Sequence, residues 1–409
     1  MSRLPAVPSA VRQKLRPLPA AVLALRQKRF GEYLPAVIAV VAVALFPIFR
    51  PPLDGLMDDA ILALAYIVMA LGLNIVVGFA GLLDLGYVAF YAFGSLMAGW
   101  LASDHFAKVN DGKGIFAGVN EFVKTSSPQG IHLNFLLIVL VAIAIAAIAG
   151  AIIGLPTLRL RGDYIAIVTL AFGEIIGRFV ANGDSVKISG YALSNGRQSI
   201  SPLDQLDLPF VPEFDSATNL RPYYWAVLAM ILVVLFVNFR LRDSRLGRAW
   251  VALREDEVAA VSMGIPLVRT KLMAYAVGAS FGGISGAFLG VYSNTVNGNA
   301  FQFGFSIFIL AMVIMGGLGS IWGVVIGAVL LSFVNTRLIP DVLDGEGVRS
   351  FLSGFGLDFT FSEVSFGVFG FILLLMMVLR PEGLLPERRR KLELAEGVGA
   401  EESVFEGRA

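Results

Sequence analysis

The 409-residue chain contains no cysteine and only two histidines, His105 and His132. Without cysteine, the chain cannot form disulfides, thiolate metal sites, iron–sulfur clusters or a cysteine nucleophile. Two histidines in one predicted extramembrane loop are too few for a histidine-rich metal site. We therefore expect no metal site and interpret both histidines as solvated loop residues.

Motifs for several other kinds of chemistry are also missing. No G-x-x-x-x-G-K-[ST] sequence occurs, so the chain is not expected to bind ATP itself. No Ser/His/Asp set lies at a predicted membrane face, which argues against a polytopic membrane enzyme. The sequence has no basic patch with interleaved aromatics for nucleic acid, and no series of acidic residues or histidines along its spans for proton coupling. We expect neither a cofactor nor a catalytic residue in this chain.

Charge is scarce as well. Only 15% of the residues are charged, whereas 56% are hydrophobic, and the mean hydropathy is +0.76. This composition predicts an all-α polytopic membrane protein. A helix needs about 20 residues to cross the hydrocarbon core of a bilayer. The predicted spans are ten, at residues 34–49, 58–78, 82–102, 134–155, 163–181, 222–239, 271–292, 302–318, 320–337 and 363–380.

The basic segments predict the orientation of these spans. Ten spans place both termini on one side, together with the basic N-terminal tail (1–33), the turn 159–163, the segment 240–271 and the C-terminal tail (386–409). The positive-inside rule makes that side cytoplasmic. No short apolar core with a cleavage site closely follows the N-terminal tail, so it is not expected to be a secretory signal peptide. The transmembrane domain between the two tails is residues 34–385.

Glycine interrupts the predicted spans at two places. Residues 78–86 (GFAGLLDLG) and 316–323 (GGLGSIWG) join neighbouring spans with too few residues for a proper loop. Each is either a tight turn at the membrane surface or a broken helix that lines a path. Elsewhere glycine recurs every four residues, which predicts close helix packing through small faces. The packing glycines are Gly278, Gly282, Gly286 and Gly290 in one span and Gly319, Gly323 and Gly327 in another.

A few polar residues lie within the predicted spans. Glu174 and Arg178 are four residues apart on one helical face, with Glu174 about 16 Å from the cytoplasmic end of its span. A charge at that depth costs about 3 kcal/mol or more. The two residues form either a self-neutralising ion pair or a polar element of a substrate path. Further candidates for the path, which can equally serve packing or hydrogen bonding, are Asn74, Asp84, Thr169 and Asn294.

Residues 240–271 form a charged segment between two apolar stretches. Its centre, GRAWVALREDEVAAVSMG (247–264), is predicted to be one amphipathic helix. Its apolar positions near helical spacing are Leu246, Trp250, Leu253 and Val261. A water-exposed helix on the basic side suits contact with a soluble partner. The alternative is a solvated loop or an interfacial helix lying on lipid.

Five segments in order together resemble the LivM-type permease of branched-chain amino acid ABC importers, over about residues 58–387. The segments are 74–102, 158–178 (LRLRGDYIAIVTLAFGEIIGR), 244–265 (SRLGRAWVALREDEVAAVSMGI), 316–328 (GGLGSIWGVVIGA) and 379–386 (LRPEGLLP). Each motif alone is weak, whereas five in sequence are specific. One stretch departs from the family: VKISGYALSNGRQSI (186–200) stands where a T-G-G-x-x-G sequence is usual, which leaves the outer vestibule and the exact substrate open.

The resemblance implies the permease subunit of an ATP-driven importer in the bacterial inner membrane, which translocates branched-chain or related hydrophobic amino acids. Residues 34–385 are then a permease domain, with 240–271 as its cytoplasmic coupling loop. The implied partners are a second homologous permease, two ABC ATPases that bind the ATP, a periplasmic solute-binding protein, the amino acid and the lipid bilayer. The implied ATPase-coupling residues are Gly247, Arg248, Arg254, Glu255, Asp256, Ala259, Ala260 and Gly264. The implied framework residues are Gly162, Tyr164, Glu174, Gly317, Gly319 and Gly323.

A second interpretation is an ion- or proton-coupled carrier in which Glu174 titrates. It predicts uptake that continues without any ATPase and stops when the proton gradient collapses. An importer of the first kind requires ATP instead, so the two hypotheses are separated by the energy source.

Overall fold

The computed structural model of the chain divides into two compact units, residues 1–51 and 52–409. Among its described residues, the first unit contains the short 3-10 helix η2 (Phe46–Phe49). The second unit contains the elements discussed below. The structure describes residues 41, 43–107, 117–118, 130–157, 164–188, 191–196, 198–208, 211–214, 216–345, 361, 364–380 and 382–385.

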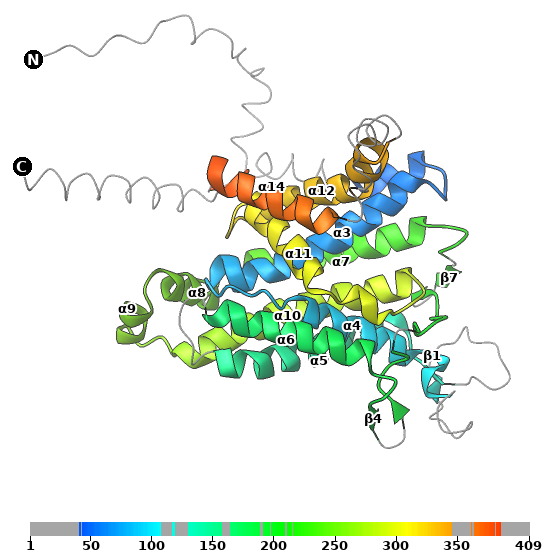
Figure 1. The fold of residues 1–409 in the computed structure, drawn as a ribbon, viewed down its shortest axis with the longest axis horizontal. Coiled ribbons are helices and arrows are strands. Elements are labelled where there is room, and N and C mark those ends of the chain that lie inside the picture. Colours follow the sequence, from blue (N-terminus) through cyan, green and yellow to red (C-terminus); the bar gives the residue numbers. More distant parts are fainter. Residues whose placement is uncertain are drawn as a thin grey trace, which may run out of the picture. The chain divides into compact units, whose positions relative to one another are not determined.

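The second unit is built from apolar helices (Figure 1). In the described part of the chain, six helices are long and apolar enough to cross a membrane: α3 with its π-helical continuation η3 (Gly55–Phe79), α5 (Phe135–Thr157), α6 (Tyr164–Ala181), α7 (Arg221–Arg242), α10 (Leu267–Tyr292) and α12 with its continuation η6 (Ile321–Leu343). Shorter apolar helices are α4 (Val88–Leu101), α11 (Phe303–Gly316) and α14 (Ser365–Leu379). Two polar helices, α8 (Arg245–Glu255) and α9 (Glu257–Ser262), connect α7 to α10.

Nine of the ten predicted spans coincide with apolar helices in the described residues. Half of the first, 34–49, lies outside those residues, so the number of ten and the orientation of the termini stay predictions. The third prediction, 82–102, is wrong at its start because residues 80–87 are not helical and α4 begins only at Val88. A 14-residue helix is about 21 Å long, shorter than the hydrocarbon core of about 30 Å. This span is therefore helical over only part of its length.

The core is centred on α3 and α10. In the most apolar part of α3, 72% of the residues are buried inside the chain, and in that of α10, 67% are. The corresponding share is 28% in both α5 and α6. Helix α10 packs on α3, α4 and α5. The outer faces of α5 and α6 are therefore left for lipid or for another protein.

Small residues bring α10 to backbone distance from its neighbours. A Cβ built on Gly286 would lie 2.2 Å from the carbonyl oxygen of Tyr91 in α4, and one on Gly283 would lie 2.8 Å from that of Ala142 in α5. The hydroxyl of Ser285 donates to the carbonyl of Ala65 in α3 at 2.9 Å. Close backbone approach at small residues is the usual way in which helices associate in lipid.

Short strands lie at one end of the second unit and α8 and α9 at the other (Figure 1). Strands β1 (Ala102–Ser103), β3 (Ile131–His132) and β2 (Ala117–Gly118) form one sheet in that order, with β1 antiparallel and β2 parallel to β3. Two antiparallel hairpins join β4 (Lys187–Ile188) to β5 (Tyr191–Ala192) and β6 (Leu206–Leu208) to β7 (Val211–Phe214). We call these two ends of the unit the strand end and the α8 end.

Both histidines lie at the strand end, and the prediction that they are solvated is wrong. His105 is 4% exposed and His132 is 6% exposed. The Nδ1 atom of His132 lies 2.8 Å from Asp204, and its Nε2 atom lies 3.4 Å from Asp104. Burial raises the pKa of the Asp204 carboxyl, an effect that His132 opposes. These side chains hold the loops together, and no group of three or more His, Cys, Asp or Glu side chains among the described residues is arranged so that it could hold a metal ion.

Candidate functional site

Helix α8 is fixed to the bundle by its apolar face. The hydroxyl of Ser244 caps the helix by accepting the N–H of Gly247 at 3.1 Å. Trp250 and Leu253 are buried, and the indole N–H of Trp250 donates to the carbonyl of Thr270 at 2.8 Å. Thr270 lies in the first turn of α10, so α8 cannot shift without acting on that central helix.

The centre of the charged segment, residues 247–264, lies in two helices, so the prediction of one continuous helix there is wrong. The backbone leaves helical geometry at Asp256 (φ −152°, ψ 110°). The carboxylate of Asp256 accepts the N–H groups of Val258 at 2.8 Å and Ala259 at 3.0 Å, which caps a new helix, α9. Because the helix restarts there, Val261 is 47% exposed and does not share the buried face of Trp250.

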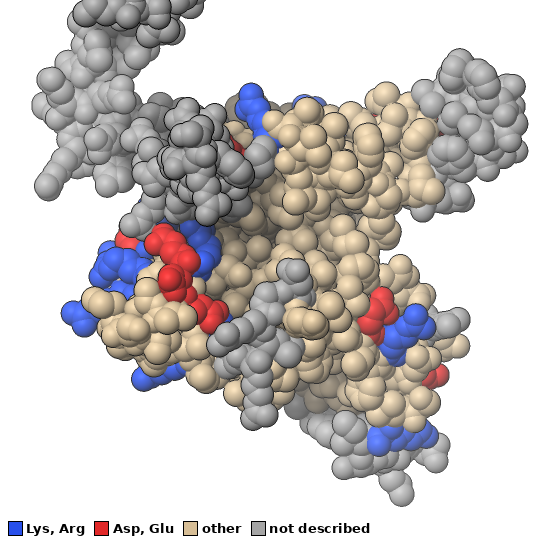
Figure 2. All heavy atoms as spheres, turned by 60° about the vertical axis from the view of Figure 1, so that its left-hand side comes forward, with Lys and Arg blue, Asp and Glu red and all other residues tan. Residues whose placement is uncertain are grey.

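The α8 end presents a mixed charged and apolar surface. Figure 2, which turns this end forward, shows acidic and basic side chains gathered there against a mostly uncharged surface. The sequence did not single out Val258 and Met263, which are 76% and 85% exposed between these charges. Of the predicted coupling residues, Arg248, Glu255, Asp256, Ala259 and Gly264 are exposed, Arg254 is half-buried, and Gly247 and Ala260 are buried.

Arg254 connects α8 to the end of α3. Its Nη1 atom donates to the carbonyl oxygen of Gly78 at 2.7 Å, within the π-helical turns of η3 (Asn74–Phe79). Its side-chain stem packs on Gly81, where a Cβ would lie 2.5 Å from Cγ of Arg254 and where φ is +70°. A cation at a helix C-terminus interacts favourably with the helix dipole and the last carbonyls. Arg254 therefore completes the end of this helix.

The two glycine-rich interruptions meet beside Arg254. The side-chain oxygen of Asn74 accepts the N–H of Gly319 at 2.9 Å, in the turn between α11 and α12. Gly319 has φ +84° and precedes α12, so it does not lie on the same helical face as Gly323 and Gly327. The prediction that these three glycines form one packing face is therefore wrong for Gly319. We call Asn74, Gly78, Gly319 and Arg254 the junction.

Residues 80–87 lead from the junction to α4 without forming a helix. The N–H of Leu85 donates to the hydroxyl of Thr169 in α6, and that of Val88 donates to Ser306 in α11, each at 3.0 Å. One oxygen of Asp84 accepts the N–H of Gly86 at 2.9 Å, and the other is buried without a partner among the described residues. Neighbouring helices satisfy this backbone, as a broken helix in a membrane requires.

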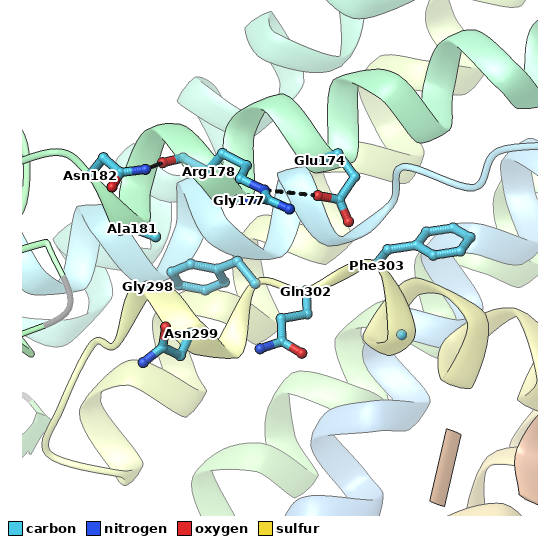
Figure 3. Close-up of a pocket in the computed structure, with 11 residues that line it drawn as sticks. Glu174, Gly177, Arg178, Ala181, Asn182, Gly298, Asn299, Gln302 and Phe303 are labelled. Carbon is cyan, nitrogen blue, oxygen red and sulfur yellow. Dashed lines mark hydrogen bonds and ion pairs between the residues drawn. The ribbon is translucent and has the colours of Figure 1, made fainter. Parts of the chain in front are cut away.

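Glu174 and Arg178 line a pocket near the strand end (Figure 3). The two side chains form an ion pair in α6 with Nε and Oε2 3.5 Å apart. The pocket has a volume of about 370 Å³ and lies between α6 and residues 298–304, which include η5 (Gly298–Ala300) and the start of α11. Asn299 and Gln302 in the second wall were not indicated by the sequence, because loop amides carry no periodic signal.

A helix outside the bundle is joined here to a broken helix within it, and broken helices of this kind are common in transport proteins. A family model described as "Branched-chain amino acid transport system / permease component" matches residues 56–379. The chain belongs to this family.

Relatives of this permease agree. The chain is 34% identical over 362 residues to the "High-affinity branched-chain amino acid transport system permease protein LivM" of Escherichia coli K12, which covers 86% of this chain and 74% of that protein. A probable LivM of Methanocaldococcus jannaschii is 26% identical to this chain, and the match covers 79% of this chain and 91% of that protein. LivH, a permease protein of Salmonella typhimurium, is 30% identical to this chain, and the match covers 42% of this chain and 48% of that protein. No solved structure matches the chain.

The predicted path residues of this permease fall in separate places. Asn74 is part of the junction, Asp84 and Thr169 lie together along the broken helix, and Glu174 lies in the pocket. Asn294 lies apart at the strand end, where its side-chain oxygen accepts the N–H of Leu203 at 2.7 Å. Of the framework residues, Tyr164 is 68% exposed and Gly162 lies outside the described residues.

Proposed function

We propose that this chain is the permease subunit of an ATP-driven importer that carries branched-chain or related hydrophobic amino acids into the cytoplasm. The family match and the names of its relatives support the substrate class. The sequence has no P-loop, so the ATP has to be bound by other subunits. The chain then contributes helices and a coupling surface and carries out no covalent catalysis.

The assembly that we propose contains two permeases, two ABC ATPases and a solute-binding protein in the bacterial inner membrane. This chain is similar to LivH, a second permease protein, over 42% of its length. That similarity supports pairing of two related permeases. The proposed topology has ten spans, with both termini and the α8 end in the cytoplasm and the strand end outside. The strand end, with its loops 103–133 and 182–221, would receive the loaded binding protein.

The contact between Arg254 and Gly78 carries the proposal of ATP coupling. An ATPase that binds α8 and α9 moves Trp250 against α10 and Arg254 against η3 at the same time. The junction passes this movement to Gly319 through Asn74, and thus to the turn between α11 and α12. The end of α3, the end of α11 and the start of α12 would then move together. Alternating access requires such a joint movement of helices around the substrate site.

Reconstitution of the complete complex tests this function. The permease, its homologous partner and both ATPases are placed in proteoliposomes with ATP on the ATPase side, and loaded binding protein is added opposite. We expect uptake of radiolabelled leucine, isoleucine or valine that needs ATP and all subunits. Uptake by this chain alone, driven by a proton gradient and abolished by an uncoupler, would instead establish the carrier in which Glu174 titrates.

A further inference from the structure

The charged face of α6 is the least expected surface of the bundle. The side chain of Arg178 is 80% exposed and that of Glu174 is 43% exposed, although both lie in an apolar spanning helix. Charged side chains facing lipid are costly and rare, and they normally face a protein interior or a water-filled cavity. This face of α6 therefore borders water or another subunit.

The ion pair is loose enough to accept a ligand. Its single contact, between Nε of Arg178 and Oε2 of Glu174, is 3.5 Å long, which is long for a charge-assisted hydrogen bond. Among the described residues this is the sole ion pair that either side chain makes. A guanidinium has five N–H donors and a carboxylate can accept several hydrogen bonds, so most of the capacity of both groups remains available.

The pocket beside this pair has the size of a small-molecule site and a mainly polar lining. Its volume of about 370 Å³ lies within the range of about 300–1,000 Å³ typical of ligand pockets. The amide side chains of Asn299 and Gln302 line the wall opposite α6, and Phe303 contributes apolar surface beside them (Figure 3). α6 crosses this wall closely, since a Cβ on Gly177 would lie 2.3 Å from the carbonyl of Phe301.

The charge of the pocket selects among ligands. One carboxylate and one guanidinium sum to zero, so an anion or a cation would meet one matching and one repelling group. An amino-acid zwitterion carries both opposite charges on groups bonded to the same carbon and can satisfy both side chains together. We propose that this pocket binds the main-chain zwitterion of the transported amino acid, with Glu174 receiving the ammonium group, Arg178 the carboxylate, and Phe303 the aliphatic side chain.

This inference rests on the proposed function, and cysteine labelling tests it separately. Because the chain has no cysteine, Asn299→Cys places a single thiol in this subunit, at an exposed position of the pocket wall. The complete complex is treated with a membrane-impermeant maleimide with and without leucine, leucinamide or 4-methylpentanoate. The last two compounds each lack one charge of the zwitterion. Ser293→Cys, exposed at the strand-end terminus of α10 and outside the pocket lining, is the matched control.

We expect leucine to slow the labelling of Asn299→Cys several-fold and to leave that of Ser293→Cys unaffected, while neither singly charged compound protects. Equal labelling with and without leucine, equal protection by all three compounds, or a thiol that the reagent does not reach would overturn the inference. If the unsubstituted complex transports leucine with ATP in any of those cases, the proposed function stands and only the site fails.

Exchange of the two charges distinguishes a substrate site from a structural ion pair. Glu174→Arg combined with Arg178→Glu keeps an i, i+4 pair on the same helix but reverses its direction. Uptake should fall about tenfold or more, the size expected for losing charge-assisted hydrogen bonds, while ATP hydrolysis stimulated by the binding protein persists. Normal uptake by the exchanged variant would contradict the proposed site and assign the pair a structural role.

Discussion

Two arginines at opposite ends of the bundle are held in very different ways. Arg254 donates to a backbone carbonyl at 2.7 Å, and its stem packs against the backbone of Gly81. Arg178 is 80% exposed and has a single ion-pair contact at 3.5 Å. A guanidinium bound to a neighbouring backbone transmits a displacement from one helix to another. One that is loosely paired can exchange its partner for a ligand.

The space around the two arginines differs in the same way. At the junction a Cβ on Gly78 would lie 2.6 Å from the backbone nitrogen of Gly319, so no additional atom fits. At the strand end the pocket beside Arg178 holds about 370 Å³. The α8 end is thus suited to rigid transmission and the region of Arg178 to binding, and substitutions should affect the two regions unequally.

The largest effect is expected from filling the junction. In Gly78→Ala the added methyl group meets the backbone of Gly319 and the side chain of Asn74, so α3 and the α11–α12 turn have to separate. Overpacking of this kind costs about 1–3 kcal/mol, and more where backbone cannot move. We expect loss of thermal stability in detergent and poor assembly with the partner subunits, measured by size-exclusion chromatography after heating.

Gly367→Ala is the matched control for this substitution. Gly367 lies in α14, where an added Cβ would meet no neighbouring atom within 4 Å, and alanine is the better helix former by about 1 kcal/mol. We expect this variant to be as stable as the parent protein or slightly more so. Equal stability of both alanine variants would show that the junction is not closely packed.

A smaller effect is expected from weakening the junction while leaving its packing in place. Arg254→Gln removes a charge-assisted hydrogen bond to Gly78, which typically contributes about 1.5–3 kcal/mol. We expect the amount of leucine transported per ATP hydrolysed to fall about tenfold in the reconstituted complex, with the permease still assembled. Arg245→Gln, an exposed arginine at the start of the same helix, should leave this ratio unchanged. A ratio that is equal in both variants would argue against coupling through Gly78.

The sequence predicted those features that depend on local periodicity. Long apolar stretches predicted the helices, and the spacing of Trp250 and Leu253 predicted the buried face of α8. The break at Asp256 was missed because the amphipathic pattern continues across it, although an aspartate before a short apolar stretch is a typical helix cap. Local patterns therefore identified the elements better than their boundaries.

The contacts that make the candidate sites depend on residues far apart in the chain. Arg254 and Gly78 are 176 residues apart, and Asn74 and Gly319 are 245 apart, so no short window contains both partners. The pocket likewise combines a helix that the sequence predicted with loop amides that have no periodic signal. The sequence identified Glu174 and Arg178 as unusual, but only the fold supplies the opposite wall.

The smallest effect is expected at the strand end, from the buried carboxyl of Asp207. One of its oxygens accepts the N–H of Phe135 at 2.8 Å at the start of α5, and the other has no partner among the described residues. Burial raises the pKa of Asp207, and the nearby carboxylate of Asp204 raises it further, while the hydrogen bond from Phe135 lowers it. A raised pKa in the folded state means that folding favours the protonated carboxyl. This contribution to stability is complete below the unfolded pKa of about 3.9 and is lost as the pH rises through the folded pKa.

Asp207→Asn keeps the acceptor for Phe135 but cannot ionise. The melting temperature of the parent protein should therefore fall relative to that of Asp207→Asn as the pH rises above about 4 through the folded pKa of Asp207. We expect a relative change of about 2 °C or less, measured by tryptophan fluorescence during heating in detergent. Asp184→Asn, which replaces an exposed carboxyl at the same end, is the control. The difference in melting temperature between this variant and the parent protein should not change with pH. If the melting temperatures of Asp207→Asn and the parent protein also change in parallel with pH, the charge of the buried carboxyl is compensated by a group other than a proton. The polar groups of the strand end would then be as completely paired as those of the junction.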